Sequence, residues 1–214
     1  MRIRRFSNVI YVEFCDSIDP ECNAKVLHLD GALASRSPDW LLEAVPSYAS
    51  LALLVDTGTR SAGAIADELT EICSSMPRDP QRRKGKLHQL RVRYGDEYGP
   101  DLDFVASNAG MTEEEAIAIH SGREYLCYML GFTPGFAYLG DLDERIAAPR
   151  LETPRLRVAA GSVGIAGRQT GFYGVESPGG WRIIGRLENS TFDVNREPPS
   201  SILPGDRVRF QRIG

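Results

Sequence analysis

Glycine recurs through the second half of the chain, and this feature limits the possible folds more than any other. Of the 21 glycines, 11 lie between Gly131 and Gly185, and the run AAGSVGIAGRQTGFYGVESPGGWRIIGR places many of them three or four residues apart. Glycine loses more conformational freedom on folding than any other residue, so the run is costly unless the backbone needs it. A phosphate-binding loop, a tight all-β scaffold, or a surface approached closely by a ligand or another chain would need it.

The segments around the glycines favour a closed β structure. Residues 123–132, REYLCYMLGF, are apolar on both alternating faces, which is typical of a buried strand. Short β-like segments separated by glycine and proline follow, and the chain closes with LPGDRVRF, a turn and an alternating strand. This succession predicts a sandwich or a barrel.

The first half of the chain alternates short strands and helices. Asp19 and Pro20 suit the start of one helix, and Pro77 ends another. Thr112 and Glu115 have the capping-box spacing of a third helix. The pattern predicts strands at 9–14, 40–46, 50–56 and 87–94, and helices at 19–35, 60–76, 100–110 and 112–122. The strand at 50–56 is apolar on both faces and should be central in its sheet.

A polar, proline-containing segment, PRDPQRRKGK at 77–86, is the best candidate for a linker. We therefore expect an α+β protein of two domains. A small two-layer α+β domain occupies residues 1–86, linker included, and a β domain occupies residues 87–214.

Composition excludes several classes of function. The formal net charge of −4 provides no positive field for nucleic acid, and the basic cluster Arg82, Arg83, Lys84 and Lys86 suits a solvated linker. No run of about 18 apolar residues is present, so we expect no membrane span. The four cysteines lack CxxC spacing, and a reducing cytoplasm is the simplest setting.

The familiar catalytic and nucleotide motifs are absent. The glycine run fits neither the Walker A loop nor the Rossmann fingerprint, and no G-x-S-x-G nucleophile elbow occurs. The three histidines are scattered, so we expect no metal site. His120 ends a predicted helix, where a capping role and a site role are both open.

Several side chains among the glycines could bind a small polar ligand. Ser162, Gln169 and Thr170 are short polar groups beside exposed backbone amides, and Arg155 could join them in binding an anion. Trp181 follows two glycines and is either barrel core or an interface anchor. The stretch GFTPGFAYLG likewise suits core packing or a stiff loop that presents aromatic faces.

Three long blocks carry a resemblance to a known family. They are EYLCYMLGFTPGFAYLG, PRLETPRLRVAAGSVGIAGRQTG and ESPGGWRIIGR, supported by IHSGREY and LPGDRVRF. Together they resemble the KipI-like family, which includes the B-type component of 5-oxoprolinase and allophanate hydrolase subunit 1. The resemblance implies that the second domain is a cyclophilin-like β-barrel.

The resemblance also implies a function. Such a protein acts with two partners: a KipA-like protein, which is the C-type component of 5-oxoprolinase, and the A-type component. Together the three form an ATP-dependent 5-oxoprolinase, which opens 5-oxo-L-proline to L-glutamate. One alternative is the carboxyltransferase half of a urea or allophanate pathway enzyme, which would use biotin. Another is an inhibitor of a sporulation-type histidine kinase, a protein-interaction role.

We expect a glycine-lined substrate pocket between this barrel and the related barrel of its partner, or a partner interface, around the loops from Gly131 to Trp181. ATP is expected to serve the complex, and no single catalytic role is assigned. The predicted site residues are His120, Phe132, Pro134, Phe136, Arg155, Ser162, Gln169, Thr170 and Trp181.

Overall fold

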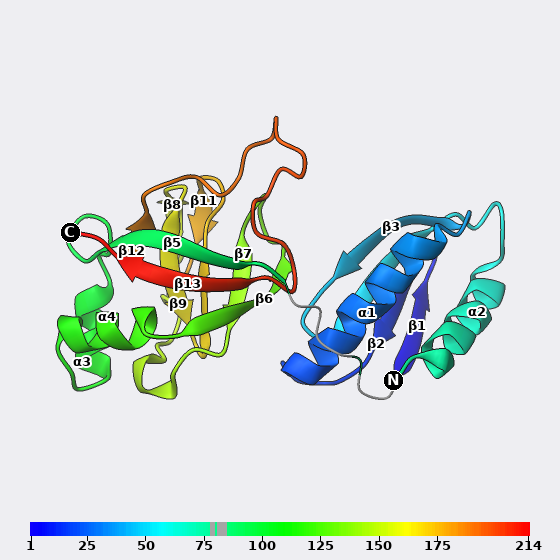
Figure 1. Ribbon diagram of the computed structural model, residues 1–214, viewed down its shortest axis with the longest axis horizontal. Coiled ribbons are helices and arrows are strands. Elements are labelled where there is room, and N and C mark those ends of the chain that lie inside the picture. The colour runs from blue at the N-terminus through cyan, green and yellow to red at the C-terminus, as the bar shows by residue number, and fades with distance from the viewer. Residues whose placement is uncertain (78–79, 81–84) are drawn as a thin grey trace. The chain divides into compact units, whose positions relative to one another are not determined.

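The protein folds into two compact units, residues 1–84 and 85–214 (Figure 1). The computed structural model describes residues 1–77, 80 and 85–214. Most of the predicted linker at 77–86, with Arg82, Arg83 and Lys84, therefore lies outside the described residues. Each unit has a hydrophobic core of its own.

The N-terminal unit is a four-stranded antiparallel sheet with two helices. Its sheet order is β1-β2-β4-β3, so β4 is central as predicted from its apolar faces. Leu29, Leu53 and Leu69, from the first helix, β4 and the second helix, are fully buried in the common core. The elements are β1 (Arg2–Phe6), β2 (Val9–Glu13), α1 (Pro20–Arg36), β3 (Leu41–Pro46), β4 (Ser50–Val55) and α2 (Ala62–Ser75).

Three local features of this unit bear on the sequence expectations, and the first of them confirms a prediction. The Asp19 side chain caps α1 by accepting hydrogen bonds from the backbone amides of Glu21 and Cys22, which confirms the predicted helix start. The disulfide between Cys15 and Cys22 was not predicted. Strand β1 was also missed, because its arginine-rich sequence has the charged character of an edge strand and no apolar alternation.

The C-terminal unit is built around a closed seven-stranded barrel, which confirms the predicted α+β fold with a β-barrel. The strand order is β10-β7-β6-β13-β5-β12-β9, and β9 pairs with β10 to close it. Only β13 and β5 run parallel among the barrel pairs described. The strands are β5 (Leu87–Tyr94), β6 (Glu124–Leu130), β7 (Ala137–Gly140), β9 (Ser162–Ala166), β10 (Gln169–Phe172), β12 (Arg182–Leu187) and β13 (Arg207–Arg212).

Short elements cover the barrel. They are α3 (Leu102–Asn108), α4 (Glu113–Ser121), the 3-10 turn η1 (Glu144–Ile146) and a two-stranded sheet of β8 (Arg155–Val158) and β11 (Ser177–Gly179). Thr112 and Glu115 form the predicted capping box at the start of α4. Among the helices that the structure describes, none combines the length and apolar character needed to cross a bilayer.

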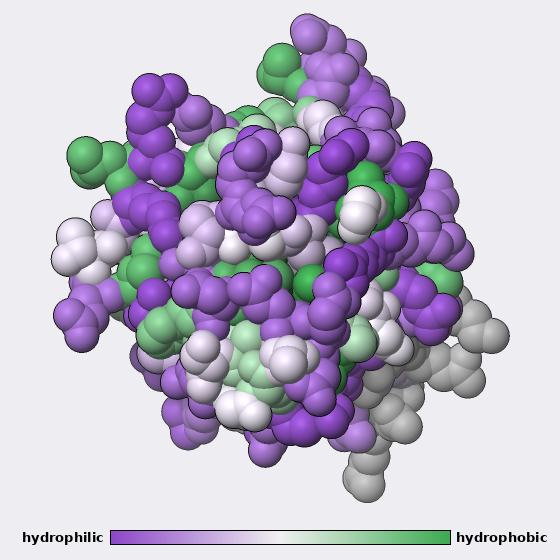
Figure 2. Space-filling model, turned by 90° about the vertical axis from the view of Figure 1, so that its left-hand side faces the viewer, coloured by the Kyte–Doolittle hydropathy of each residue, from purple (hydrophilic) through white to green (hydrophobic). Residues whose placement is uncertain are grey.

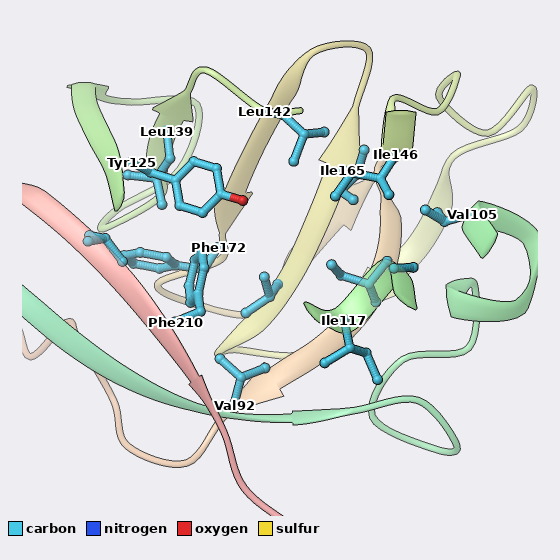
Figure 3. Packing of buried hydrophobic residues seen from close by; sticks show 14 of the residues in the cluster. Val92, Val105, Ile117, Tyr125, Leu139, Leu142, Ile146, Ile165, Phe172 and Phe210 are labelled. Carbon is cyan, nitrogen blue, oxygen red and sulfur yellow. The ribbon is translucent and has the colours of Figure 1, made fainter. Parts of the chain in front are cut away.

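The barrel is filled by large apolar side chains. Figure 3 shows Tyr125, Phe172 and Phe210 together in the interior, with Ile165 nearer the end that Val105 of α3 covers. All these side chains are essentially inaccessible to solvent. In the view of Figure 2, polar side chains cover most of the surface, and apolar ones lie in small separate areas.

Candidate functional site

A pair of glycines opens the outer wall of the barrel. Gly164 on β9 and Gly171 on β10 are direct cross-strand partners. Their neighbours Val163, Ile165 and Phe172 belong to the barrel core, so alternation along the strands turns both glycines outward. A Cβ on Gly171 would overlap the Ala137 carbonyl oxygen, and one on Gly164 would lie 3.1 Å from the Cβ of Trp181. The two glycines therefore allow a bulky group to lie close against the wall.

The group that uses this space is an aromatic cluster separate from the barrel core. Trp181 and Phe136 meet edge to face with ring centroids 5.2 Å apart, and Phe136 also packs against Tyr173 at 4.8 Å and Tyr138 at 4.6 Å. Phe132, 64% exposed, stands edge-on to Phe136. Part of the glycine run thus makes room for aromatic side chains of the same chain, whereas the close approach expected from the sequence was by a ligand or another chain.

A hollow of about 320 Å³ adjoins this cluster. The β8–β11 sheet and the loops before it supply one side, and the aromatic cluster supplies the other. Its lining residues are Phe132, Tyr138, Arg150, Leu151, Pro154, Tyr173, Pro178, Gly179, Gly180 and Trp181. Hollows of this size that combine aromatic walls with a few polar groups are the usual form of a small-molecule site.

The polar groups of the hollow are two phenols and one cation. Burial raises the pKa of Tyr173 and of Tyr138, and the positive charge of Arg150 offsets part of the rise for both hydroxyls. The backbone amide of Trp181 lies close enough to the Tyr173 oxygen to lower its pKa in part. Both phenols therefore keep their protons at neutral pH.

Arg155 lies beside this region and is held by a buried carboxylate. Asp101, 5% exposed, accepts a 2.9 Å hydrogen bond from Arg155 Nη2 and a 2.6 Å bond from the Ile183 backbone amide. Arg182 approaches the same carboxylate at 3.8 Å and stacks over the Phe104 ring at 3.6 Å. The Nη1 atom of Arg155 is buried and has no hydrogen-bond partner among the described residues.

His120 and Thr170 come together inside the barrel. His120 Nε2 lies 2.8 Å from Thr170 Oγ1, and Nδ1 lies 2.8 Å from the Tyr94 hydroxyl. Because the Thr170 hydroxyl donates to the Gly164 carbonyl oxygen, His120 must donate from Nε2 and accept from Tyr94 at Nδ1. Burial lowers the pKa of His120 to about 3, so the imidazole is neutral.

The predicted site residues thus fall in several places. Phe132 and Trp181 line the hollow and Phe136 packs behind them, whereas His120 and Thr170 lie in the barrel interior. Ser162 is buried on β9, Gln169 is half-buried on β10, and Pro134 is exposed, with its carbonyl oxygen against Gly174. A site role for each of these remains a prediction.

Sequence reasoning missed the polar residues of the hollow. Arg150 follows a proline in an unremarkable loop, and Tyr173 directly follows the last residue of β10, among glycines. The one available signal was the aromatic stretch that includes Tyr138, because alternating rings and glycines indicate close packing. For metals, no group of three or more His, Cys, Asp or Glu side chains is placed to hold an ion within the described ranges.

Known proteins match this chain over most of its length. Residues 1–202 match the family described as Carboxyltransferase domain, subdomain C and D. The B-type component of 5-oxoprolinase from Bacillus subtilis (strain 168) is 36% identical over 217 residues, which cover 96% of this chain and 90% of that protein.

Two solved structures share the fold. The crystal structure of TTHA0988 matches 100% of this chain with a TM-score of 0.85 and 36% identity, and this chain spans 40% of that longer chain. Kluyveromyces lactis urea carboxylase matches 99% of this chain with a TM-score of 0.82, and this chain spans 22% of it. At 19% identity, this second likeness shows the fold alone.

Proposed function

The chain belongs to the family of the carboxyltransferase domain, subdomains C and D, and from this premise we propose that it is the B-type component of an ATP-dependent 5-oxoprolinase. The observation that carries the proposal is the 36% identity to a 5-oxoprolinase component of that type over nearly the whole of both chains. The complex would open 5-oxo-L-proline to L-glutamate in the cytoplasm, where ATP is available.

The proposal includes partner proteins. The matching regions of TTHA0988 and of urea carboxylase are each a minor part of a longer polypeptide, which supports a fold that works beside further domains. We assign those neighbours to a KipA-like protein and to the A-type component of the enzyme. The Bacillus subtilis relative is likewise named as one component of a multi-subunit enzyme.

The reaction explains why a shaped, apolar hollow is useful. A lactam carbonyl is a poor electrophile because the ring nitrogen shares its electron pair with the carbonyl. Hydrolysis adds water to the carbonyl carbon, breaks the carbon–nitrogen bond and leaves a carboxylate and a protonated amine. Hydrogen bonds to the carbonyl oxygen stabilise the charge that develops there, most strongly where water is excluded.

We place the ATP site on another polypeptide of the complex. The hollow offers one cation, Arg150, and proline and aromatic walls, whereas triphosphate sites use several backbone amides at a helix N-terminus together with a lysine. The residues present therefore do not fit a nucleotide, and no step of its chemistry is assigned to this chain.

A second candidate function is half of a biotin-dependent carboxyltransferase, which the description of the matching family favours. It requires a biotinylated partner and a carboxyl acceptor such as urea. An inhibitor of a histidine kinase is a third role, and it would need neither a substrate nor the other components.

Reconstitution tests the proposal. This chain, its KipA-like partner and the A-type component are purified and assayed for glutamate formed from 5-oxoproline and ATP, with each of the three omitted in turn. We expect turnover only with the complete set. Turnover by the isolated chain would contradict the proposed dependence on partners. No turnover by the complete set, together with carboxyl transfer from a biotinylated partner to urea, would select the second candidate.

A further inference from the structure

The hollow beside Trp181 has the lining of a site for a small, flat anion. Its walls are aromatic rings, proline rings and glycine backbone, which suit a flat ring, and no acidic side chain is among its described lining residues. Arg150 is the one charged side chain among the described residues that line it. A ligand that fills this hollow therefore gains from carrying a negative charge at one end.

Arg150 is available to pair with such a charge. In the same unit, Arg155, Arg168 and Arg182 each contact a carboxylate of this chain. Within the part of the chain that the structure describes, Arg150 forms no ion pair, and its charge reaches the two phenols of the hollow. A free guanidinium is well suited to a bidentate pair with a carboxylate.

Tyr173 supplies a second polar contact. The residue is 1% exposed, and its hydroxyl has no hydrogen-bond acceptor among the described residues. The hydroxyl points at Gly179, a lining residue, where a Cβ would overlap it. A buried hydroxyl proton without an acceptor is costly, and a carbonyl oxygen in the hollow would accept it.

We infer that the hollow binds a cyclic amide that carries a carboxylate. Arg150 pairs with the carboxylate, the rings of Trp181 and Tyr138 pack against the flat ring, and the Tyr173 hydroxyl donates to the ring carbonyl oxygen. The identity of the ligand as 5-oxoproline rests on the proposed function. The hydroxyl then polarises the ring carbonyl, whose carbon must accept water, while keeping its own proton.

Binding measurements on the full chain and on the assembled complex test this inference. The titrants are 5-oxoproline, its uncharged carboxamide, and proline, which lacks the ring carbonyl. We expect Arg150→Gln to weaken 5-oxoproline binding by about tenfold or more and to leave carboxamide binding unchanged. Tyr173→Phe should weaken binding of both lactams by about two- to tenfold and leave proline unaffected.

Matched controls separate local from general effects. Arg145→Gln removes an exposed guanidinium that is paired with Asp143, away from the hollow, and Tyr11→Phe removes a phenol in the N-terminal unit. Both should bind 5-oxoproline as the unaltered chain does. Thermal unfolding of each variant confirms that it is folded. Tyr173→Phe is a conservative change because it removes only the hydroxyl group.

The outcomes distinguish this inference from the proposed function. If the complex forms glutamate but Arg150→Gln and Tyr173→Phe bind 5-oxoproline normally, the inference is wrong and the function stands. If Arg150→Gln weakens 5-oxoproline binding but the unaltered complex forms no glutamate, the proposed binding site is correct and the proposed 5-oxoprolinase function is wrong. The inference is overturned if neither the chain nor the complex binds 5-oxoproline. It is also overturned if Arg150→Gln prevents complex formation but leaves the affinity for 5-oxoproline unchanged.

Discussion

The indole of Trp181 lies against Gly171, where an added Cβ would stand 3.2 Å from the ring. Gly171 belongs to a barrel strand and Trp181 immediately precedes another, so the contact joins the aromatic cluster to the barrel wall. Trp181 also lines the hollow, so the same contact holds one of its walls against the barrel.

Adding a methyl group at Gly171 should disrupt this contact. In Gly171→Ala the new Cβ overlaps the Ala137 carbonyl oxygen, so the strands must separate, and we expect a loss of about 1–3 kcal/mol in the free energy of unfolding. Gly31→Ala is the matched control, because nothing lies within 4 Å of that exposed position in α1. The control should gain about 0.5–1 kcal/mol. Urea unfolding measures both, and equal effects would contradict the packing account.

Truncation of Trp181 should weaken the folded state of this chain more than it weakens binding to the partner. The side chain is 6% exposed and contacts two other rings, so Trp181→Ala should lower the free energy of unfolding by about 3–5 kcal/mol. Trp181→Phe keeps an aromatic ring and should lose less. Unfolding and partner pull-down are measured on both variants. A stable Trp181→Ala chain that no longer binds its partner would show an interface anchor instead.

Removal of the Asp101 carboxylate should be costly because two cations depend on it. In Asp101→Asn the amide oxygen still accepts from the Ile183 backbone, but Arg155 and Arg182 lose their counter-charge. We expect a loss of about 2–3 kcal/mol in unfolding free energy. Glu176→Gln, at an exposed carboxylate that pairs with Arg157, is the control and should change stability by less than about 1 kcal/mol. Similar losses in the two variants would mean that burial of Asp101 adds nothing.

His120 should make the fold sensitive to acid. The unfolded chain takes up a proton at this histidine near pH 6.5, while the folded protein resists it until about pH 3. The free energy of unfolding should therefore fall as the pH drops below about 6.5, by up to about 1.4 kcal/mol per pH unit from this group. In His120→Gln that contribution disappears and the pH slope becomes shallower. Identical slopes in both proteins, from denaturant unfolding at several pH values, would rule out a buried neutral histidine.

Much of the fold could be predicted because its signals are local. The caps at Asp19 and Thr112 depend on residues within three positions, and the apolar run of β4 indicates a strand buried on both faces. Glycine spacing is likewise a local pattern, and it indicates tight turns and close approaches of the backbone. Strand β1 was missed because its pairing with β2, and not its own side chains, makes it a strand.

The candidate site was harder to predict because its contacts join distant segments. Asp101 and Arg155 are 54 residues apart, and His120 and Thr170 are 50 apart, so neither pair leaves a pattern in the sequence. The sequence identified Thr170 and His120 as polar residues worth attention, but not that they bond to each other inside the barrel. Arg150 and Tyr173 carried no signal, because each matters through a partner it lacks among the described residues: an acidic group for Arg150 and a hydrogen-bond acceptor for Tyr173.

The central claim is that this chain holds the lactam that the complex opens. The most direct measurement is the KM for 5-oxoproline of the complete enzyme, at saturating ATP, assembled with unaltered or Arg150→Gln chains. We predict that the KM rises by about tenfold or more in the variant while kcat changes little. An unchanged KM in an active complex would contradict the claim.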